Sequence, residues 1–439
     1  MRGVSIALTV LLATGKYALY GFTWQDLPAY LLLMPCIFPA IDTGRGLNWT
    51  GRICFGGLAA ACVGAWILPA VPTLPPPQGR YAVGTQIYRW TDSSRDEPHT
   101  ENPNDRRSVI AQAWYPAIRG ETSGHSSGLA YIDGIGRLPN YVGVMPAFLL
   151  RRYDQIDTHA VALAPVAPRG VRWPVVIFSP GYGAPRAVYT GLATQLASRG
   201  FVVFVLDHPY EAAVTELPDG RVAVAREIVL PGDPDRIQYM VREQRRRTAD
   251  VQFVIEQLAK PQALASPLRG SNIDFTKVAV IGHSFGGATA ISALVEDPRI
   301  VAAVNIDGTP YGELPDRQIT RPFLLLQSDF SETHHGELFR NGNGKLLANA
   351  TAPTFRYEIE HANHYSFTDV PFFFAPHGRW LLAQFIGGGR GPMATQRATA
   401  DILSAFLTGP LTNTAAKLSA TAVHYPGVRG GKVEGKFGI

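Results

Sequence analysis

Ser284 stands in the middle of the pentapeptide Gly-His-Ser-Phe-Gly, residues 282–286, which is a G-x-S-x-G pattern. The run 278–281 before it is short and apolar, and small, helix-forming residues follow over 288–294. A strand, a sharp turn and a helix in this order are the setting of a nucleophile elbow, in which glycines allow close backbone approach and the serine Oγ is exposed. The pattern therefore predicts that Ser284 is a nucleophile.

A serine hydroxyl needs a histidine to take its proton and an acid to orient that histidine. Two aspartates each follow an apolar run, Asp307 and Asp329, and two histidines, His361 and His364, follow the strand-like segment 355–359. The chain order serine, acid, histidine is that of an α/β-hydrolase. The residue pattern predicts a Ser–His–Asp triad and leaves open which aspartate and which histidine belong to it.

Acyl transfer also requires donors for the oxyanion that forms at the carbonyl. The backbone N–H of Phe285 directly follows the nucleophile, and a second donor is expected from an early strand-to-helix loop. The sequence Gly-Tyr-Gly at 181–183 follows an apolar run and fits that loop. Loss of one such donor typically costs about 3 to 4 kcal/mol in the barrier.

These residues need a scaffold that brings strand ends together. Apolar runs predict strands at 175–179, 201–206, 278–281, 300–306 and 322–326. Helical patterns lie between some of them, at 187–198 and, rich in Arg and Glu, at 235–258. Apolar runs alternating with helices predict a mostly parallel sheet covered on both faces. Ligands bind beyond the carboxyl ends of the strands in such sheets.

Residues 81–90 and 108–115 read as an antiparallel strand pair at the edge of this sheet. The following segment, 117–170, has no clear period, and we expect it to pass over the active-site face. Residues 76–408 form the predicted catalytic domain, and 409–439 form a C-terminal tail without a clear pattern.

Three apolar stretches, 4–22, 27–41 and 53–71, dominate the first 75 residues. About 20 helical residues cross the hydrocarbon of a bilayer. The first and third stretches are long enough, and prolines interrupt the second. We expect about three transmembrane segments over 1–75, with one or two spans plus an interfacial helix as the alternative, and a proline-rich spacer at 72–77.

Arginines flank these stretches at Arg2, Arg45 and Arg52. Cationic loops tend to stay in the cytoplasm, so an odd number of crossings would place the catalytic domain on the extracytoplasmic side. The expected location is therefore a multi-pass membrane protein with the membrane as a partner. Nothing in the sequence indicates an oligomeric state.

The chain has 439 residues, of which 17% are charged, and a formal net charge of +5. The cationic residues are scattered, which argues against nucleic acid as a partner because such binding needs a clustered basic surface. The cysteines, Cys36, Cys54 and Cys62, all lie in the N-terminal region, so nothing downstream can form a disulfide or a thiolate metal site. The motifs imply no metal and no organic cofactor.

Residues 109–390 resemble the plasma-type platelet-activating factor acetylhydrolase (isoform II) family of α/β-hydrolase serine esterases. The matching stretches are residues 178–186, 196–201, 242–244 with Arg247, 278–289, 296–299, 305–308 and 364–369. The last of these is His-Tyr-Ser-Phe-Thr-Asp and is similar to the family's H-x-x-F-x-D motif.

The resemblance implies Ser284 as nucleophile, Asp307 as acid and His364 as base, with the amides of Tyr182 and Phe285 as oxyanion donors. It thus selects one aspartate and one histidine from the two pairs that the pattern alone leaves open. It also implies short or oxidised sn-2 acyl chains of glycerophospholipids as substrates, without calcium.

The chain departs from the family in two respects. Pro180 stands where the family usually has histidine, and the three membrane segments are not part of the animal secreted enzyme. Another small carboxylic ester is therefore an alternative substrate. Two other hypotheses are a serine peptidase or amidase of the same fold, and a non-catalytic hydrolase-fold membrane protein; the intact serine, aspartate and histidine argue against the second.

Overall fold

The structure is a computed structural model that describes residues 27–31, 49–67, 71–120, 131–142, 145–227, 229–374, 376–383, 385–414 and 417–434. The chain divides into two compact units. One comprises Met1–Pro72 with Pro371–Ala383, and the other comprises Thr73–Val370 with Gln384–Ile439. All of the predicted site residues lie in the second, larger unit.

A ten-stranded sheet forms the centre of the larger unit, in the order β14-β13-β12-β11-β10-β6-β7-β2-β1-β5. Its strands are β1 (Ala82–Asp96), β2 (Arg106–Ala117), β5 (Ala160–Ala162), β6 (Trp173–Ser179), β7 (Val202–Asp207), β10 (Ile273–His283), β11 (Ile300–Ile306), β12 (Phe323–Ser328), β13 (Thr354–Ile359) and β14 (Val428–Lys432). The strands from β7 through β6 and β10 to β13 are parallel to one another, whereas β2 and β14 run antiparallel to their neighbours β7 and β13. The predicted mostly parallel sheet is confirmed.

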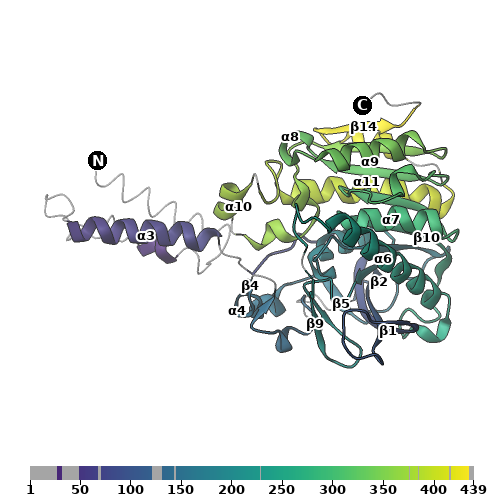
Figure 1. Ribbon diagram of the computed structural model, residues 1–439, viewed down its shortest axis with the longest axis horizontal. Helices are drawn as coiled ribbons and strands as arrows, with labels where there is room; N and C mark the ends of the chain where they lie inside the picture. The colour runs from purple at the N-terminus through teal and green to yellow at the C-terminus, as the bar shows by residue number, and fades with distance from the viewer. Residues whose placement is uncertain are drawn as a thin grey trace. The chain divides into compact units, whose positions relative to one another are not determined.

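Helices cover both faces of this sheet (Figure 1). One face carries α6 (Arg236–Leu258), α7 (Phe285–Glu296) and α9 (Glu337–Ala348), and the other carries α5 (Thr190–Ser198), α11 (Pro392–Thr412) and α12 (Leu418–Val423). Along β10, Val278 and Val280 pack into the first core, and Ala279 and Ile281 pack into the second. Successive side chains of a strand point to opposite faces, so an uninterrupted apolar run is what a strand buried on both faces requires.

The antiparallel strands β1 and β2 occur where the sequence predicts them, but they are not at the edge, because β5 pairs with β1 on its outer side. Short elements occupy the region that has no clear period: β3 (Tyr141–Val142), β4 (Met145–Pro146) and α4 (Ala147–Leu150), besides β5. A small hairpin of β8 (Val214–Glu216) and β9 (Val222–Val224) follows β7. The helix α8 (Phe330–Thr333) follows β12.

The predicted boundary at residue 408 falls inside α11, which continues to Thr412. The segment after it holds α12 and β14, and β14 pairs with β13 to complete one edge of the sheet, shown in yellow in Figure 1. The last part of the chain is thus built into the larger unit as far as Glu434, the last residue described.

The smaller unit contains α3 (Trp49–Ile67) and α10 (Pro376–Leu382). None of the helices described here is long and apolar enough to cross a membrane. Of the three predicted spans, 4–22 lies outside the described residues, and only 27–31 of the second is described, as helix. The third overlaps α3, which has 19 residues and includes Arg52 and four glycines, so the prediction of a span there is not supported.

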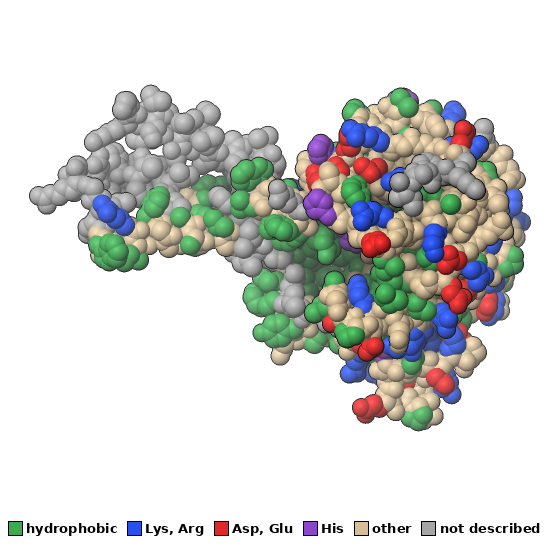
Figure 2. All heavy atoms as spheres, turned by 45° about the horizontal axis from the view of Figure 1, so that its top comes forward, with side chains coloured by type: hydrophobic (Ala, Val, Ile, Leu, Met, Phe, Trp, Pro, Cys, Tyr) green, Lys and Arg blue, Asp and Glu red, His purple; other side chains and the backbone are tan. Residues whose placement is uncertain are grey.

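Basic and acidic side chains are interspersed over the visible face of the larger unit (Figure 2). Because opposite charges alternate there, this face does not offer the continuous basic stripe that nucleic-acid binding requires.

Candidate active site

Ser284 occupies the turn between β10, which ends at His283, and α7, which begins at Phe285. Its φ is +55° and its ψ −123°, a strained conformation for a residue with a Cβ. The flanking glycines make this turn possible. A Cβ at Gly282 would overlap the carbonyl of Gly286, and one at Gly286 would overlap the carbonyl of Ser179.

Asp307 and His364 meet beside this turn. Asp307 directly follows β11, the strand next to β10, and His364 begins a short 3-10 helix after β13. His364 Nδ1 lies 2.7 Å from Asp307 Oδ2, and the His364 ring lies 4.6 Å, centroid to centroid, from that of His283. No hydrogen bond joins Ser284 Oγ to His364 in the part of the chain described, and catalytic contacts of this kind often form only when substrate binds.

The carboxylate of Asp307 is buried and fully occupied by donors. Besides His364, Oδ1 accepts from the backbone N–H of Ser328 at 2.8 Å and from His335 Nε2 at 2.8 Å, and the Ser328 hydroxyl donates to both oxygens. Burial opposes ionisation of Asp307, but the hydrogen bond from His364 and the nearby histidines outweigh it, so the pKa of Asp307 is lowered. The carboxylate therefore stays charged and holds a proton on Nδ1 of His364, which leaves Nε2 free to accept one.

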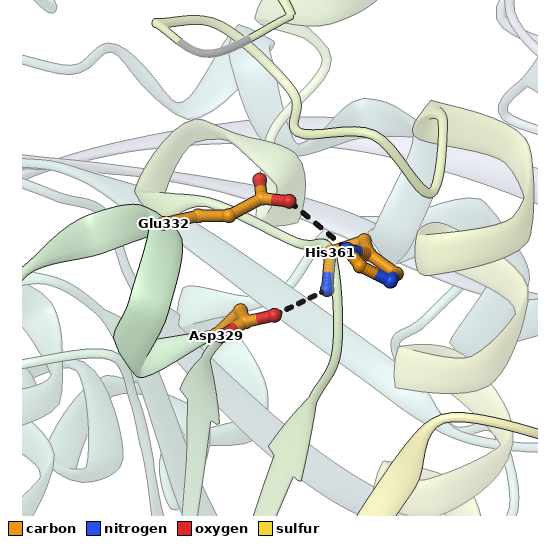
Figure 3. Close-up of side chains that lie close together, drawn as sticks. All are labelled: Asp329, Glu332 and His361. Atoms are coloured by element: carbon orange, nitrogen blue, oxygen red, sulfur yellow. Dashed lines mark hydrogen bonds and ion pairs between the residues drawn. The ribbon is translucent and has the colours of Figure 1, made fainter.

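The alternative acid and base of the sequence pattern lie elsewhere. Asp329 caps α8, accepting from Ser331 N at 2.8 Å, and also accepts from the backbone N–H of His361 at 2.8 Å. The imidazole of His361 is 69% exposed and pairs with Glu332 at 3.2 Å. Figure 3 shows these three side chains together, with atoms close enough to share a metal ion. The cap and the surface ion pair already account for them.

The backbone amides of Phe285 and Tyr182 belong to two segments that lie close to the nucleophile. The N–H of Phe285 is the first of α7, where helix amides lack partners within the helix. The loop after β6 comes close from the other side, since a Cβ added to Gly181 would lie 3.3 Å from Ser284 Cβ. Among the described residues, neither the Phe285 nor the Tyr182 amide has an acceptor. Both are therefore available to an oxyanion.

A series of hydrogen bonds through His283 links this loop to the base. The N–H of Gly181 donates to the Tyr189 hydroxyl at 2.8 Å, and that hydroxyl lies 2.9 Å from His283 Nδ1. His283 Nε2 lies 2.9 Å from the backbone carbonyl of His364. Burial and the neighbouring His364 lower the pKa of His283 to about 3, so the ring is neutral, accepts at Nδ1 and donates at Nε2. Sequence reasoning assigned no role to His283, although it occupies the variable position of the elbow pattern.

Asp369, the last residue of the motif that contains His364, is fully buried. It accepts from the N–H of Gly191 at 3.1 Å and from the Tyr131 hydroxyl at 2.9 Å. Burial raises its pKa to about 7. Asp369 thus attaches the loop of the base both to α5 and to the segment around Tyr131, which the sequence predicted to pass near the site.

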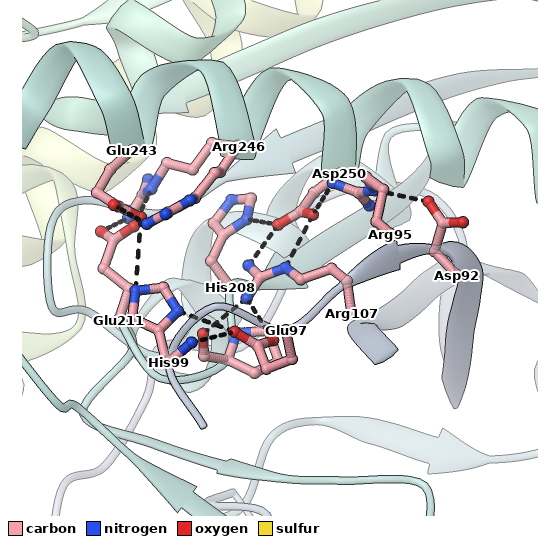
Figure 4. Close-up of polar contacts among 12 residues, drawn as sticks. Asp92, Arg95, Glu97, His99, Arg107, His208, Glu211, Glu243, Arg246 and Asp250 are labelled. Carbon is pink, nitrogen blue, oxygen red and sulfur yellow. Dashed lines mark hydrogen bonds and ion pairs between the residues drawn. The ribbon is translucent and has the colours of Figure 1, made fainter. Parts of the chain in front are cut away.

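A separate Ser–His–Asp contact series includes Ser179, which ends β6 directly before the loop that contains Gly181. Ser179 Oγ is 3.0 Å from His208 Nε2, and His208 Nδ1 is 2.7 Å from Asp250 Oδ2 on α6. All three side chains are buried, and Arg107 forms an ion pair with Asp250 at 2.7 Å. Figure 4 shows His208, Asp250 and Arg107 of this network beneath α6. A buried serine cannot reach a substrate, so this series supports the fold. In the sequence, the high Arg and Glu content of α6 was the feature that could have indicated a charged network on this helix.

A family model and two similar proteins all carry names of the same kind of esterase. The family model described as "Platelet-activating factor acetylhydrolase, isoform II" matches residues 71–260 and 264–413. A "Probable 1-alkyl-2-acetylglycerophosphocholine esterase" of Arthroderma benhamiae is 24% identical over 72% of this chain and 82% of its own length. The "Platelet-activating factor acetylhydrolase" of Cavia porcellus is 30% identical over 60% of this chain and 62% of its own.

Among solved structures, a ferulic acid esterase from Streptomyces cinnamoneus superposes with a TM-score of 0.66 and 27% sequence identity. The match covers 82% of this chain and 99% of the esterase. With the mostly parallel sheet and its two helical layers, this similarity identifies an α/β-hydrolase fold.

Proposed function

The chain belongs to the platelet-activating factor acetylhydrolase, isoform II, family of carboxylic ester hydrolases, and from this premise we propose that it hydrolyses acyl esters through Ser284, His364 and Asp307. The observation that carries the proposal is the hydrogen bond between Asp307 and His364 at 2.7 Å, formed beside a strained serine turn. An acid in contact with a histidine next to such a turn is the arrangement that activates a serine hydroxyl.

In the first step, Nε2 of His364 takes the Ser284 proton while Oγ attacks the ester carbonyl. Asp307 holds the Nδ1 proton and stabilises the imidazolium that forms. The amides of Phe285 and Tyr182 donate to the oxyanion of the tetrahedral intermediate. When the intermediate collapses, His364 returns the proton to the departing alcohol oxygen, and an acyl-serine remains.

In the second step, His364 takes a proton from water, whose oxygen attacks the acyl-serine carbonyl. The second tetrahedral intermediate collapses to the carboxylic acid, and the proton returns to Ser284 Oγ. The enzyme is thereby restored without any change in its oxidation state.

For the substrate, we propose small carboxylic esters that include short or oxidised sn-2 acyl chains of glycerophospholipids. The names of the two curated relatives support the phospholipid ester, because both refer to the acetyl ester of platelet-activating factor or of an alkyl-acetyl-glycerophosphocholine. The name of the solved relative, a ferulic acid esterase, supports a broader range of acyl groups.

We also propose that the N-terminal region attaches the enzyme to a membrane, with the catalytic unit on the extracytoplasmic side. The support is apolar surface on α3, where Trp49, Ile53, Phe55 and Val63 are each about half or more exposed. Exposed apolar side chains are stabilised when they leave water, and such surface is typical of sites that contact membranes or other proteins. Recovery of the full-length protein from cells without detergent, in the supernatant of a membrane pellet, would contradict this attachment.

The catalytic proposal is tested with Ser284→Ala. We expect the purified variant to lose hydrolysis of p-nitrophenyl acetate and labelling by a fluorophosphonate, with an unchanged melting temperature. Hydrolysis at the wild-type rate would show that another residue is the nucleophile. A series of phospholipid and simple esters of increasing acyl length, with aminoacyl amides beside them, then defines the substrate, and faster cleavage of the amides would favour a peptidase.

A further inference from the structure

Arg247 lies on the inner side of α6 and is one of the largest fully buried side chains, with 1% of its surface exposed. A buried guanidinium requires partners for its charge and its donors. Glu211 supplies the charge: Arg247 Nε lies 2.7 Å from Glu211 Oε2, and a second, shorter contact joins Nη2 to Oε1. The remaining donors of the guanidinium point toward the loop after β6.

Those donors bind two successive carbonyls of the loop. Arg247 Nη1 lies 2.6 Å from the oxygen of Pro180, and Nη2 lies 3.2 Å from the oxygen of Gly181. The same guanidinium lies over the ring of Phe285, with its central carbon 4.6 Å from the ring centroid. One side chain therefore contacts both the loop that carries the Tyr182 amide and the residue that carries the other oxyanion amide.

We infer that Arg247 is a positioning residue that holds the two oxyanion donors in register, an inference that rests on the proposed esterase function. The physical reason lies in the peptide between Gly181 and Tyr182. A trans peptide is planar, and its C=O and N–H point in opposite directions. By binding the Gly181 carbonyl on the side of α6, Arg247 aims the Tyr182 N–H away from α6, on the side where the loop approaches Ser284.

A second hydrogen bond prevents the peptide groups of Gly181 from rotating about the contact with Arg247. The Gly181 N–H is held by the Tyr189 hydroxyl at 2.8 Å, so both sides of residue 181 are fixed. At the second donor, a guanidinium is attracted to the face of an aromatic ring, and this contact of Arg247 with the Phe285 ring orients Phe285 at the start of α7. Lysine keeps the charge but cannot supply the planar fork that binds a carboxylate and two carbonyls at once.

The test compares Arg247→Lys with wild type in hydrolysis of p-nitrophenyl acetate and in inhibition by a methyl trifluoromethyl ketone, which forms an oxyanion when serine adds to it. We expect kcat to fall about 10- to 100-fold, less than the roughly 10²- to 10³-fold of deleting a donor outright. The inhibition constant should rise in proportion, while KM changes less than threefold. A loss of stability alone would lower the melting temperature without a parallel change in the inhibition constant.

Arg107→Lys is the matched control. Arg107 is also a buried arginine, and it binds Glu97, Asp250 and the carbonyl of Pro209, none of which belongs to the oxyanion loop. We expect this variant to melt at a lower temperature and to keep kcat and the inhibition constant within threefold of wild type.

If Arg247→Lys does not fold, the pair Arg247→Met with Glu211→Leu removes both charges together, which avoids an unpaired buried carboxylate. It should show the same parallel loss of kcat and of inhibitor affinity. If either variant kept both kcat and the inhibition constant within twofold of wild type, the proposed role of Arg247 would be wrong. Failure of the wild-type enzyme itself to react with a fluorophosphonate would instead overturn the proposed esterase mechanism.

Discussion

Asp307→Asn tests how the buried acid controls the protonation of His364. Oδ1 of Asp307 accepts from the backbone N–H of Ser328 at 2.8 Å, whereas Oδ2 accepts from His364 Nδ1 at 2.7 Å. A backbone N–H can only donate, so the single oxygen of an asparagine must stay at the Oδ1 position. The amide NH₂ then replaces Oδ2 and faces His364.

The consequence is an exchange of tautomers. Facing an NH₂ donor, Nδ1 of His364 must become the acceptor, and the ring proton moves to Nε2. A protonated Nε2 cannot take the proton of Ser284, and a substitution of this kind lowers kcat by about 10⁴. That factor corresponds to about 5.5 kcal/mol in the barrier.

The assay is steady-state hydrolysis of p-nitrophenyl acetate between pH 6 and 9, with the melting temperature measured in parallel. KM should change little, because the substitution leaves the shape of the site unchanged. Asp329→Asn is the matched control, since asparagine also caps a helix well, and its kcat should stay within threefold of wild type. If Asp307→Asn kept more than a tenth of the wild-type kcat, the hydrogen-bond reasoning above would be wrong.

Three further predictions follow from the same structure. His364→Gln should lower kcat more than 10³-fold, whereas His361→Gln, at an exposed ring, should change it less than threefold; the reverse order in the same ester assay would reverse their roles. Burial raises the pKa of Asp369 to about 7, above the value of about 3.9 in an unfolded chain. The protonated carboxyl therefore stabilises the fold at low pH, and this stabilisation is lost as the pH rises from about 4 through 7. Between pH 5 and 8, urea unfolding should show the wild type losing about 3 kcal/mol relative to Asp369→Asn, and a constant difference would contradict the shift. Gly286→Ala places a Cβ on the carbonyl of Ser179 and should destabilise the protein by about 1 to 3 kcal/mol or more, which thermal unfolding measures; an unchanged melting temperature would contradict the overlap.

The nucleophile turn could be predicted from sequence because what determines it is local. Gly282 and Gly286 are required by contacts within a few residues and with the adjacent strand, and the apolar runs on both sides define β10 and α7. The parallel sheet was predictable for a similar reason, since strands buried on both faces read as continuous apolar runs.

Elements that depend on distant partners were harder to predict. The strand β14 contains Gly430 and Gly431 and shows no apolar alternation, yet it pairs with β13 along the sheet edge. Residues 53–71 were predicted as a membrane span, and the helix α3 begins earlier, at Trp49, and includes Arg52, because an apolar composition alone does not show where a helix begins.

The sequence by itself determined the fold class, the family and the serine at the turn, because each depends on residue types at fixed spacing. Residue spacing alone could not choose between the two aspartates, because each directly follows a strand; the family resemblance favoured Asp307. In the tertiary structure, β11 lies next to β10, which places Asp307 one strand from Ser284 and within reach of His364. The burial of Arg247 also depends on the tertiary structure. A charged side chain on a helix is normally solvated unless it has buried partners, and here Glu211 and two loop carbonyls, all distant in sequence, bind it.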